Sequence, residues 1–452
     1  MRLRKTITTI VATAILLAGW QLFAVIANQP ELIPSLPRLV RTLCEWLVSG
    51  SFYQSVGATI LRGVLGMSIS FVCAIGMAGL FARFEWVYEL FRPLLAIMRS
   101  IPVISFILLA LIFLNPESIP LMIAFLTMFP LLTENLARGI LDLRPGLSIM
   151  ARQFHIKRSN VLFQIIYPQL KPFLYSGLAS AAGFGWRAII MGEVLSQCAF
   201  GIGSEMKRAQ NFIAVPELLA WTIVAVFISF FFDKGISKVA DITPKISFAN
   251  EDQTIPTPTL SVLDTKDISY QYGIQHFSHS FQKGIIYGIS APSGKGKTTL
   301  LNLIGGILLP TEGEIHPTRH FGIATIFQQP QLLPHLTAEE NIIFPLSSFL
   351  TEEKARRIAQ KHLQEMEMEP FGNRYPKELS YGQQQRIAIA RALAYPSPLL
   401  LMDEPFKGLD EALSHRIIER IREKQMKEER IILFTSHNPD EIRLLADEVI
   451  YL

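Results

Sequence analysis

The sequence predicts an N-terminal all-α, polytopic membrane domain followed by a C-terminal α/β domain. Of the 452 residues, 50% are hydrophobic, and the mean hydropathy of +0.32 is unusual for a soluble enzyme. Long apolar runs with few charges stop near Phe232, and after Thr259 the pattern is that of a soluble α/β protein. There, a loop of small residues and lysines, Ala291–Thr299, lies between an apolar strand and an apolar helix.

The N-terminal part contains about six stretches that approach the roughly 20 apolar residues needed to cross a bilayer. They are Thr6–Ala27, Gly63–Ala82, Pro93–Leu114, Ile119–Leu136, Pro172–Val194 and Val215–Phe232. The first resembles a signal peptide, but it is longer than the usual apolar region and no convincing cleavage site follows it. We therefore expect an uncleaved span. The third is the weakest, because Arg99 and Pro102 interrupt it.

Basic residues predict the orientation of these spans. One side of the membrane receives Arg2, Arg4, Lys5, Arg83, Arg92, Arg138, Arg144, Arg152, Lys157, Arg158, Lys171, Lys234, Lys238 and Lys245. The other side receives few, so the first side should be cytoplasmic. With an even number of spans, both ends of the membrane domain and the whole α/β domain lie in the cytoplasm.

The expected domains are a membrane domain at 1–240, a linker at 241–259 and the α/β domain at 260–452. The linker is rich in Thr and Pro, which is typical of a semi-rigid spacer. The longest loop on the basic side, Arg138–Lys171, can form one or two short helices. It is either a solvated basic loop at the headgroups or a docking surface for the α/β domain.

Charge and cysteine content exclude other classes of protein. A net charge of +4 is too small to indicate nucleic acid, and the basic residues lie beside apolar segments, as membrane topology requires. Cys44, Cys73 and Cys198 have no metal-like spacing. Cys73 and Cys198 lie in or beside apolar segments, so we expect these two to pack.

The strongest chemical motif is Ala291–Thr299, between the strand Ile285–Ser290 and the helical run Leu300–Leu309. Small residues let backbone N–H groups surround phosphates, and the helix N-terminus favours anions. Lys297 would reach the β- and γ-phosphates of ATP, and the Thr298 hydroxyl would bind Mg²⁺. The expected ATP-binding residues of the loop are Ser293, Gly294, Gly296, Lys297, Thr298 and Thr299. Ala291 replaces the usual first glycine, at about 1 kcal/mol if its φ is unfavourable.

A second motif is an apolar strand, Leu399–Met402, that ends in Asp403 and Glu404. After a phosphate loop, such a strand places Asp403 near Mg²⁺, and Glu404 would polarise the attacking water as general base. The alternative is a pair of acids that merely cap a buried strand.

Further motifs follow in a fixed order. Leu379-Ser-Tyr-Gly-Gln383 precedes an alanine-rich helix, and the strand Ile431–Thr435 ends in Ser436-His437. This domain resembles the nucleotide-binding domain of ABC transporters. Ala291–Thr299 resembles Walker A, Gln328 the Q-loop glutamine, Leu379–Gln383 the signature, Asp403-Glu404 the end of Walker B, Gly408–Asp410 the D-loop and His437 the switch histidine.

The resemblance implies an α/β P-loop NTPase of ABC type, with a helical subdomain, that hydrolyses ATP with Mg²⁺. It assigns catalysis to Glu404, His437 and Gln328, and Mg²⁺ to Thr298, Gln328 and Asp403. Tyr272 is the expected aromatic against adenine, with Tyr270 as the alternative. It also implies a head-to-tail dimer in which Ser380, Gly382 and Gln383 of one copy bind the ATP of the other. Tyr381, Lys295 and Lys407 depart from the family pattern.

The N-terminal part has motifs of its own, namely Thr59–Arg62, Arg99–Pro102, Pro168–Pro172, Gly183–Trp186, Glu193 and Gly201–Gly203. They resemble binding-protein-dependent permeases, most closely those of sulfonate, taurine, nitrate and thiamine-precursor importers. In that family a cytoplasmic helix before the Pro168 position docks into the ATPase. Here Ile149 and His155 replace the glutamate and glycine of that motif.

Glu134, Arg187 and Glu193 are ionisable residues within or at the ends of spans. Such groups are expensive in lipid, so they either line a transport pathway or pair between helices.

We expect a permease–ATPase fusion that acts as a homodimer of about twelve spans in the cytoplasmic membrane. It would import a small solute with a separate extracytoplasmic solute-binding protein. An ATP-driven exporter or lipid transporter, and a weakly hydrolysing regulatory ABC protein, are the alternatives. The solute and the choice between homodimer and heterodimer are not encoded in these motifs.

Overall fold

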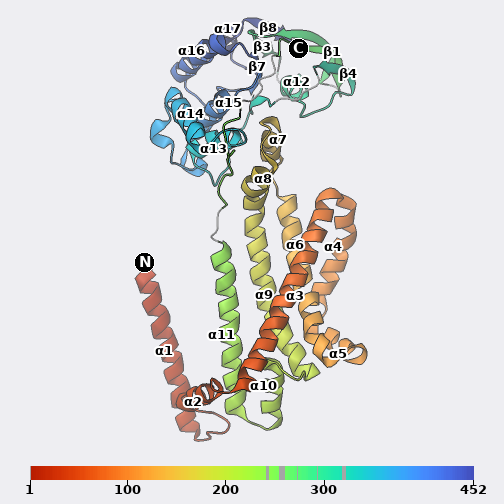
Figure 1. The fold of residues 1–452 in the computed structure, drawn as a ribbon, viewed down its shortest axis with the longest axis vertical. Coiled ribbons are helices and arrows are strands. Elements are labelled where there is room, and N and C mark those ends of the chain that lie inside the picture. Colours follow the sequence, from red (N-terminus) through yellow and green to blue (C-terminus); the bar gives the residue numbers. More distant parts are fainter. Residues whose placement is uncertain (1, 241–243, 254–259, 272, 293, 318–321) are drawn as a thin grey trace. The chain divides into compact units, whose positions relative to one another are not determined.

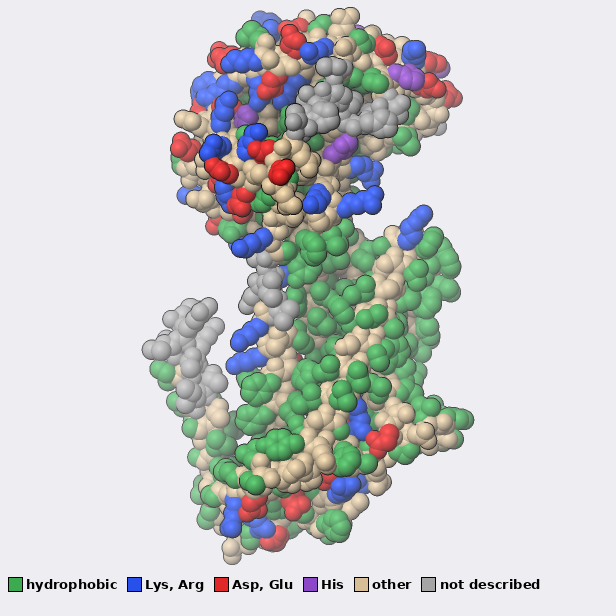
Figure 2. Space-filling view, viewed as in Figure 1, with side chains coloured by type: hydrophobic (Ala, Val, Ile, Leu, Met, Phe, Trp, Pro, Cys, Tyr) green, Lys and Arg blue, Asp and Glu red, His purple; other side chains and the backbone are tan. Residues whose placement is uncertain are grey.

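The computed structural model describes the chain except residues 1, 241–243, 254–259, 272, 293 and 318–321 (Figure 1). The chain divides into two compact units. The membrane unit comprises Met1–Leu143 and Gln169–Ile242, and the C-terminal unit comprises Arg144–Pro168 and Thr243–Leu452. On the face drawn in Figure 2, hydrophobic side chains cover the helices of the membrane unit, whereas charged side chains are spread over the C-terminal unit.

The membrane unit is built from helices alone in the part that the structure describes. These are α1 (Arg2–Ala27), α2 (Leu36–Trp46), α3 (Gly50–Arg83), α4 (Glu85–Ser100), α5 (Val103–Phe113), η1 (Pro116–Ser118), α6 (Ile119–Leu141), α9 (Tyr167–Ser196), α10 (Ile202–Asn211) and α11 (Val215–Ala240). Small residues allow close packing, since a Cβ on Gly66 of α3 would lie 2.6 Å from the Ala124 Cβ of α6.

Four helices are long and apolar enough to cross a membrane, namely Gly50–Arg83, Pro116–Leu141, Arg158–Ser196 and Val215–Ile236. They contain the predicted second, fourth, fifth and sixth spans. Of the predicted first span, the described apolar part is Val11–Ala27, which is shorter than a full span. The predicted count of about six therefore remains approximate.

The predicted third span, Pro93–Leu114, is broken beside Pro102, one of the two residues that interrupt it in the sequence. It consists of the end of α4 and the whole of α5, which are bent by 91°. The chain is extended at Ile101, with ψ of 129°, because the residue before a proline avoids the helical region. Pro102 then lies directly before α5.

The core of the C-terminal unit is a five-stranded parallel sheet of order β5-β6-β7-β3-β8. Its strands are β3 (Ile286–Ser290), β5 (Ala324–Ile326), β6 (Leu399–Asp403), β7 (Ile431–Thr435) and β8 (Glu448–Tyr451). Every residue of β6 and β7 is buried, as expected for parallel strands covered on both faces. A three-stranded antiparallel sheet of order β2-β1-β4 contains β1 (Val262–Tyr270), β2 (Ile274–Gln282) and β4 (Glu312–His316).

Helices complete this unit: α12 (Lys297–Ile304), α13 (Ala338–Leu346), α14 (Glu352–Glu365), α15 (Tyr381–Ala394), α16 (Glu411–Glu428) and α17 (Pro439–Leu445). Helices α13, α14 and α15 pack on one another and form the helical subdomain. Two of them begin with a capping box, Thr337 with Glu340 in α13 and Ser380 with Gln383 in α15.

The loop between α6 and α9 belongs to the C-terminal unit. It forms α7 (Pro145–Gln153), α8 (Arg158–Asn160) and the π-helix η2 (Val161–Ile166). Leu147, Met150 and Phe154 are at most 2% exposed and join the core of the C-terminal unit. Of its two predicted roles, this loop takes the docking one.

Part of the predicted linker also packs on the C-terminal unit. The amide of Ala249 donates to the carbonyl of Ser347 at 3.0 Å, and that of Gln253 to Phe349 at 2.8 Å. Ala249 and Gln253 of the predicted linker are therefore attached to the segment that follows α13.

Candidate functional site

The candidate site lies where neighbouring parallel strands end. The loop after β3 leads into α12, β6 ends at Asp403, and β7 ends at Thr435. Because β3, β7 and β6 are adjacent in the sheet, their carboxyl ends meet at one edge, the usual place for a ligand in such a sheet.

Asp403 is the most constrained carboxylate of this edge. The Thr298 hydroxyl donates to it at 2.9 Å, and the Thr435 hydroxyl donates to it at 2.8 Å. Burial raises the pKa of Asp403, and the hydrogen bonds from Thr435 and Thr298 only partly offset that effect. The neighbouring Glu404 charge acts in the same direction as burial. Thr435 was not identified from the sequence, although its place at the end of β7 pointed to this edge.

Lys297 is buried, with 7% of its surface exposed, and faces the phosphate loop. Its Nζ donates to the Ala291 carbonyl at 2.6 Å and lies 3.4 Å from the Nδ1 of His437. Gly296 has a φ of +92° and a Cβ there would lie 2.7 Å from the Gly273 carbonyl oxygen, so the loop needs glycine at this position.

Ala291 carries no left-handed strain. Ala291 is not one of the described non-glycine residues that have a positive φ. The expected penalty for this departure from the glycine pattern is therefore absent.

Glu404 lies next to Asp403 and is 16% exposed. Its Oε1 is 3.0 Å from the Nε2 of His437, and its Oε2 is 3.2 Å from the Nζ of Lys407 and 3.3 Å from the Nε2 of Gln328. Burial would raise the pKa of Glu404, but hydrogen bonds from Gln328 and Lys407 and the nearby positive charge outweigh burial and lower it. Its φ of +47° is unfavourable for a non-glycine residue, a feature common at functional sites.

Thr298, Asp403 and Gln328 line one cavity of about 260 Å³. Mg²⁺ prefers oxygen ligands and keeps several waters, so a hydroxyl, a carboxylate and an amide oxygen suit it. Among the described residues, no group of three or more His, Cys, Asp and Glu could hold a metal alone. The oxygen atoms of Thr298, Asp403 and Gln328 are a donor set of the kind that Mg²⁺ prefers.

Two predicted ATP-binding residues, Tyr272 and Ser293, lie outside the described residues. The alternative aromatic, Tyr270, is half-buried and packs against the core beneath the antiparallel sheet. Gly294, with a φ of +81°, lies in the loop, and Thr299 lies in the first turn of α12, which begins before the predicted helical run from Leu300.

The signature residues are engaged within their own helix. Ser380 caps α15, because its Oγ accepts from the Gln383 amide at 3.3 Å while the Gln383 side chain accepts from the Ser380 amide at 2.9 Å. Gly382 packs against the D-loop, where a Cβ would meet the Gly408 carbonyl oxygen at 2.6 Å. The described contacts do not bring these three residues to Lys297 or Thr298 of the same chain.

The loop between α6 and α9 enters this unit beside the site. Gln153 is 5% exposed, its Nε2 donates to the Gly305 carbonyl at 2.8 Å, and its own carbonyl accepts from the Ile323 amide at 2.8 Å. The Thr325 hydroxyl lies 3.4 Å from Gln153 Oε1. Gln153 therefore connects the end of α12 with β5, and its role was not recognised from the sequence.

The two departures in the docking motif differ in kind. His155 has a φ of +48°, so it adopts a conformation that favours the glycine of the family motif. Ile149 lines the same cavity as Thr298, Gln328 and Asp403.

Farther along the loop, polar side chains attach it to the linker. Asn160 donates to the Ser247 carbonyl at 2.8 Å and accepts from the Ser247 amide at 3.0 Å. Gln164 donates to the Pro244 carbonyl at 2.9 Å.

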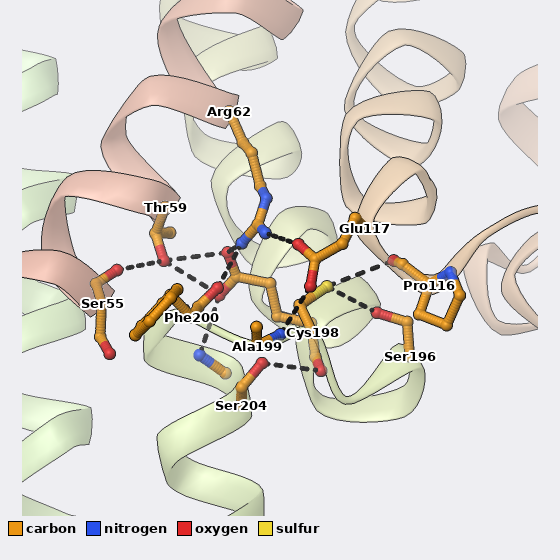
Figure 3. A network of polar contacts seen from close by, with 12 residues as sticks. Ser55, Thr59, Arg62, Pro116, Glu117, Ser196, Cys198, Ala199, Phe200 and Ser204 are labelled. Carbon is orange, nitrogen blue, oxygen red and sulfur yellow. Dashed lines mark hydrogen bonds and ion pairs between the residues drawn. The ribbon is translucent and has the colours of Figure 1, made fainter.

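In the membrane unit, the side chain of Glu193 is fully buried. Its partners Thr59 and Arg62 belong to the polar network drawn in Figure 3. Glu193 accepts from Arg62 at 2.7 Å, from the Thr59 hydroxyl at 2.9 Å and from the Gly203 amide at 2.9 Å. Arg62 also pairs with Glu117 at 2.7 Å. The network joins α3, α9, α10 and the turn before α6, which favours helix pairing over a transport pathway for Glu193.

Glu134 is also paired, with Arg99 at 2.5 Å and with Arg138 one turn along α6. Arg187 is exposed and lies over the ring of Phe184, 5.5 Å from its centroid.

Two family models match the chain. Residues 274–407 match the family described as ABC transporter. Residues 68–233 match the family described as binding-protein-dependent transport system inner membrane component.

Curated relatives match the C-terminal part. The Fe(3+) ions import ATP-binding protein FbpC of Rhizobium etli is 35% identical over 189 residues, which are 40% of this chain and 54% of the relative. The glucose import ATP-binding protein GlcV of Saccharolobus solfataricus is 36% identical over 185 residues, 38% of this chain and 52% of the relative. The spermidine/putrescine import ATP-binding protein PotA of Nitrosomonas europaea is 33% identical over 204 residues, 42% of this chain and 56% of the relative. The chain spans about half the length of the curated relatives it matches.

Proposed function

We propose that this chain, which joins a binding-protein-dependent permease to an ABC transporter ATPase, uses ATP hydrolysis to import a small solute across the cytoplasmic membrane. One observation supports the proposal above all others. Residues 144–168 lie inside the region that matches the permease, yet they pack into the ATPase unit. A permease loop buried in an ATPase has the position needed to pass a change at the nucleotide to the membrane helices.

The ATP step follows from the residues at the sheet edge. Lys297, now bonded to the Ala291 carbonyl, would exchange that carbonyl for the phosphates. Bound Mg²⁺, held by Thr298, Asp403 and Gln328, would supply positive charge to the phosphate oxygens. Glu404 would take a proton from the attacking water as the bond to the γ-phosphate breaks, giving ADP and inorganic phosphate. His437, 3.0 Å from Glu404, would orient that carboxylate.

The docked loop connects to the same residues. Gln153 bonds to Gly305 at the end of α12 and to the strand β5. Helix α12 begins at Lys297, and β5 leads directly to Gln328. A shift of either element on binding or release of the γ-phosphate would therefore move α7, and with it the ends of α6 and α9.

The signature residues support a second copy as partner. Because the contacts of Ser380, Gly382 and Gln383 stay within α15 and the D-loop, their phosphate-binding role needs another chain. We therefore propose a homodimer of about twelve spans with its ATPase units in the cytoplasm. An extracytoplasmic solute-binding protein would deliver the solute. Nucleic acid is not among the proposed partners.

Reconstitution of the full chain into liposomes tests the proposal. ATP hydrolysis and solute uptake should both rise when a candidate solute-binding protein is added on the side opposite the ATPase. Movement of solute out of the ATPase compartment without any binding protein would identify an exporter. Hydrolysis that responds to no binding protein, with no solute movement in either direction, would favour the regulatory alternative.

A further inference from the structure

Two side chains near Glu404 have no part in the ATP step described above. Lys407 and Tyr381 both depart from the pattern of the family. Lys407 lies directly before the D-loop, and Tyr381 lies in the first turn of α15. Their contacts converge on the same pair of site residues, Glu404 and Gln328.

Lys407 contacts the carboxylate directly. Its Nζ is 3.2 Å from Glu404 Oε2, and 52% of the Lys407 side chain is exposed. The same oxygen accepts from Gln328 Nε2 at 3.3 Å, while Oε1 faces His437 at 3.0 Å. A carboxylate oxygen accepts about two hydrogen bonds, so Oε2 has no acceptor position left for a water.

Tyr381 contacts the backbone on both sides of this pair. Its hydroxyl donates to the Gln328 carbonyl at 2.7 Å. Its ring packs on Gly408, where a Cβ would lie only 2.8 Å from the ring, and Gly408 has a φ of +79°. Gly408 follows Lys407 in the chain. The contacts therefore form a closed cycle through five residues, namely Tyr381, Gln328, Glu404, Lys407 and Gly408.

We propose that Tyr381 and Lys407 are positioning residues that hold Glu404 and Gln328 in an inactive arrangement through contacts within one chain, which we call the latch. Binding of ATP and of a second copy would open the latch by moving the signature, Leu379–Gln383, away from Gln328. This inference rests on the proposed ATP hydrolysis. While this cycle of contacts is complete, Glu404 Oε2 is occupied, and the Gln328 carbonyl is bonded to Tyr381 of α15. Because α15 contacts both Gln328 and Gly408, a movement of α15 would break the Tyr381–Gln328 and Lys407–Glu404 contacts together.

The test measures kcat and KM for ATP with the full chain in liposomes. Lys407→Met should raise kcat by about two- to fivefold, the factor that corresponds to a partly exposed ion pair, with KM unchanged. Lys407→Arg should keep the low kcat of the parent chain, because it keeps a cation beside Glu404. Lys283→Met is the matched control, since Lys283 pairs with Glu429 at 3.0 Å away from the site; it should leave both constants unchanged.

The hydroxyl of Tyr381 gives an independent test. Tyr381→Phe keeps the ring on Gly408 but removes the bond to Gln328, and it should also raise kcat. Tyr451→Phe, at an exposed tyrosine of β8, is its control. If both contacts belong to one latch, either change alone opens it. The kcat of the double variant Tyr381→Phe/Lys407→Met should then be no higher than that of the faster single variant.

The outcomes separate the latch from the proposed function. A rate that falls or stays constant in Lys407→Met, or rates that multiply in the double variant, would overturn the latch while hydrolysis itself stands. Hydrolysis absent from the parent chain and from every variant would overturn both. Binding of a fluorescent ATP analogue with unchanged affinity identifies variants that remain folded, so a lost rate is not mistaken for a lost fold.

Discussion

Two carboxylates of this molecule have strong partners but different freedom. Glu193 in the membrane unit is 0% exposed, and its partners Arg62, Thr59 and Gly203 belong to packed helices. Glu404 in the C-terminal unit is 16% exposed, and one of its partners, Lys407, is 52% exposed. The first set of partners cannot be exchanged without unpacking helices, whereas the second can. The difference predicts that Glu193 stabilises the fold and that Glu404 acts in chemistry.

Glu404→Gln should have the largest effect, and on rate alone. Loss of a general base lowers a rate by about 100- to 10,000-fold, while Lys297 and Thr298 remain to bind ATP. Hydrolysis by the purified full chain and binding of an ATP analogue would be measured together. Turnover near that of the parent chain would remove Glu404 as the base.

Glu193→Leu should give the opposite result. It removes one partner of Arg62, whose side chain is 13% exposed and keeps its pair with Glu117, so the loss of stability should be below the roughly 3–5 kcal/mol of an uncompensated buried charge. We expect a lower thermal midpoint and yield, with ATP hydrolysis per folded molecule retained. Glu45→Gln is the control, because Glu45 forms an exposed pair with Arg41 at 3.1 Å and should change stability by less than about 1 kcal/mol. A stable Glu193→Leu that fails to move solute would instead place Glu193 on the transport pathway.

The sequence allowed much of this comparison to be predicted. Asp403, Glu404 and Lys297 follow local motifs, and the strand–loop–helix order brings them to one sheet edge. Contacts between distant segments could not be predicted, because nothing local encodes them. The bonds of Gln153 to Gly305 and of Tyr381 to the Gln328 carbonyl are of this kind.

The membrane unit shows the same limit. Proline at 102 identified the break in this span, but the angle of 91° also depends on how α4 and α5 each pack on α6, which the sequence does not specify. The role of Glu193 remained open for the same reason. Its partners Arg62 and Thr59 are 131 and 134 residues away in the chain.

Gln153→Ala should have an effect smaller than that of Glu404→Gln or Glu193→Leu. It should change the coupling of ATP hydrolysis to solute uptake and not the hydrolysis rate or the fold alone. It removes the bond to Gly305 and leaves a buried carbonyl without its donor, a loss of about 1–3 kcal/mol. Hydrolysis should continue while solute uptake per ATP falls. Arg152→Ala, at the exposed neighbouring position of α7, is the control and should preserve the ratio. A preserved ratio in Gln153→Ala would contradict coupling through this bond.

The smallest effect is expected at two helix-capping residues that have the same geometry, one with a structural role and one with a proposed function. Thr337 and Ser380 each cap a helix of the same subdomain through a capping box, so replacing either by alanine should be destabilising by about 1 kcal/mol. Ser380 is also the residue proposed to meet the ATP of a second copy. Ser380→Ala should therefore lower ATP hydrolysis beyond what its stability loss explains, whereas Thr337→Ala should lower stability alone. Thermal unfolding and hydrolysis rates of the two variants check this. Equal rates in the two variants would mean that Ser380 serves only as a cap, and that the signature motif of this chain does not bind ATP across a dimer.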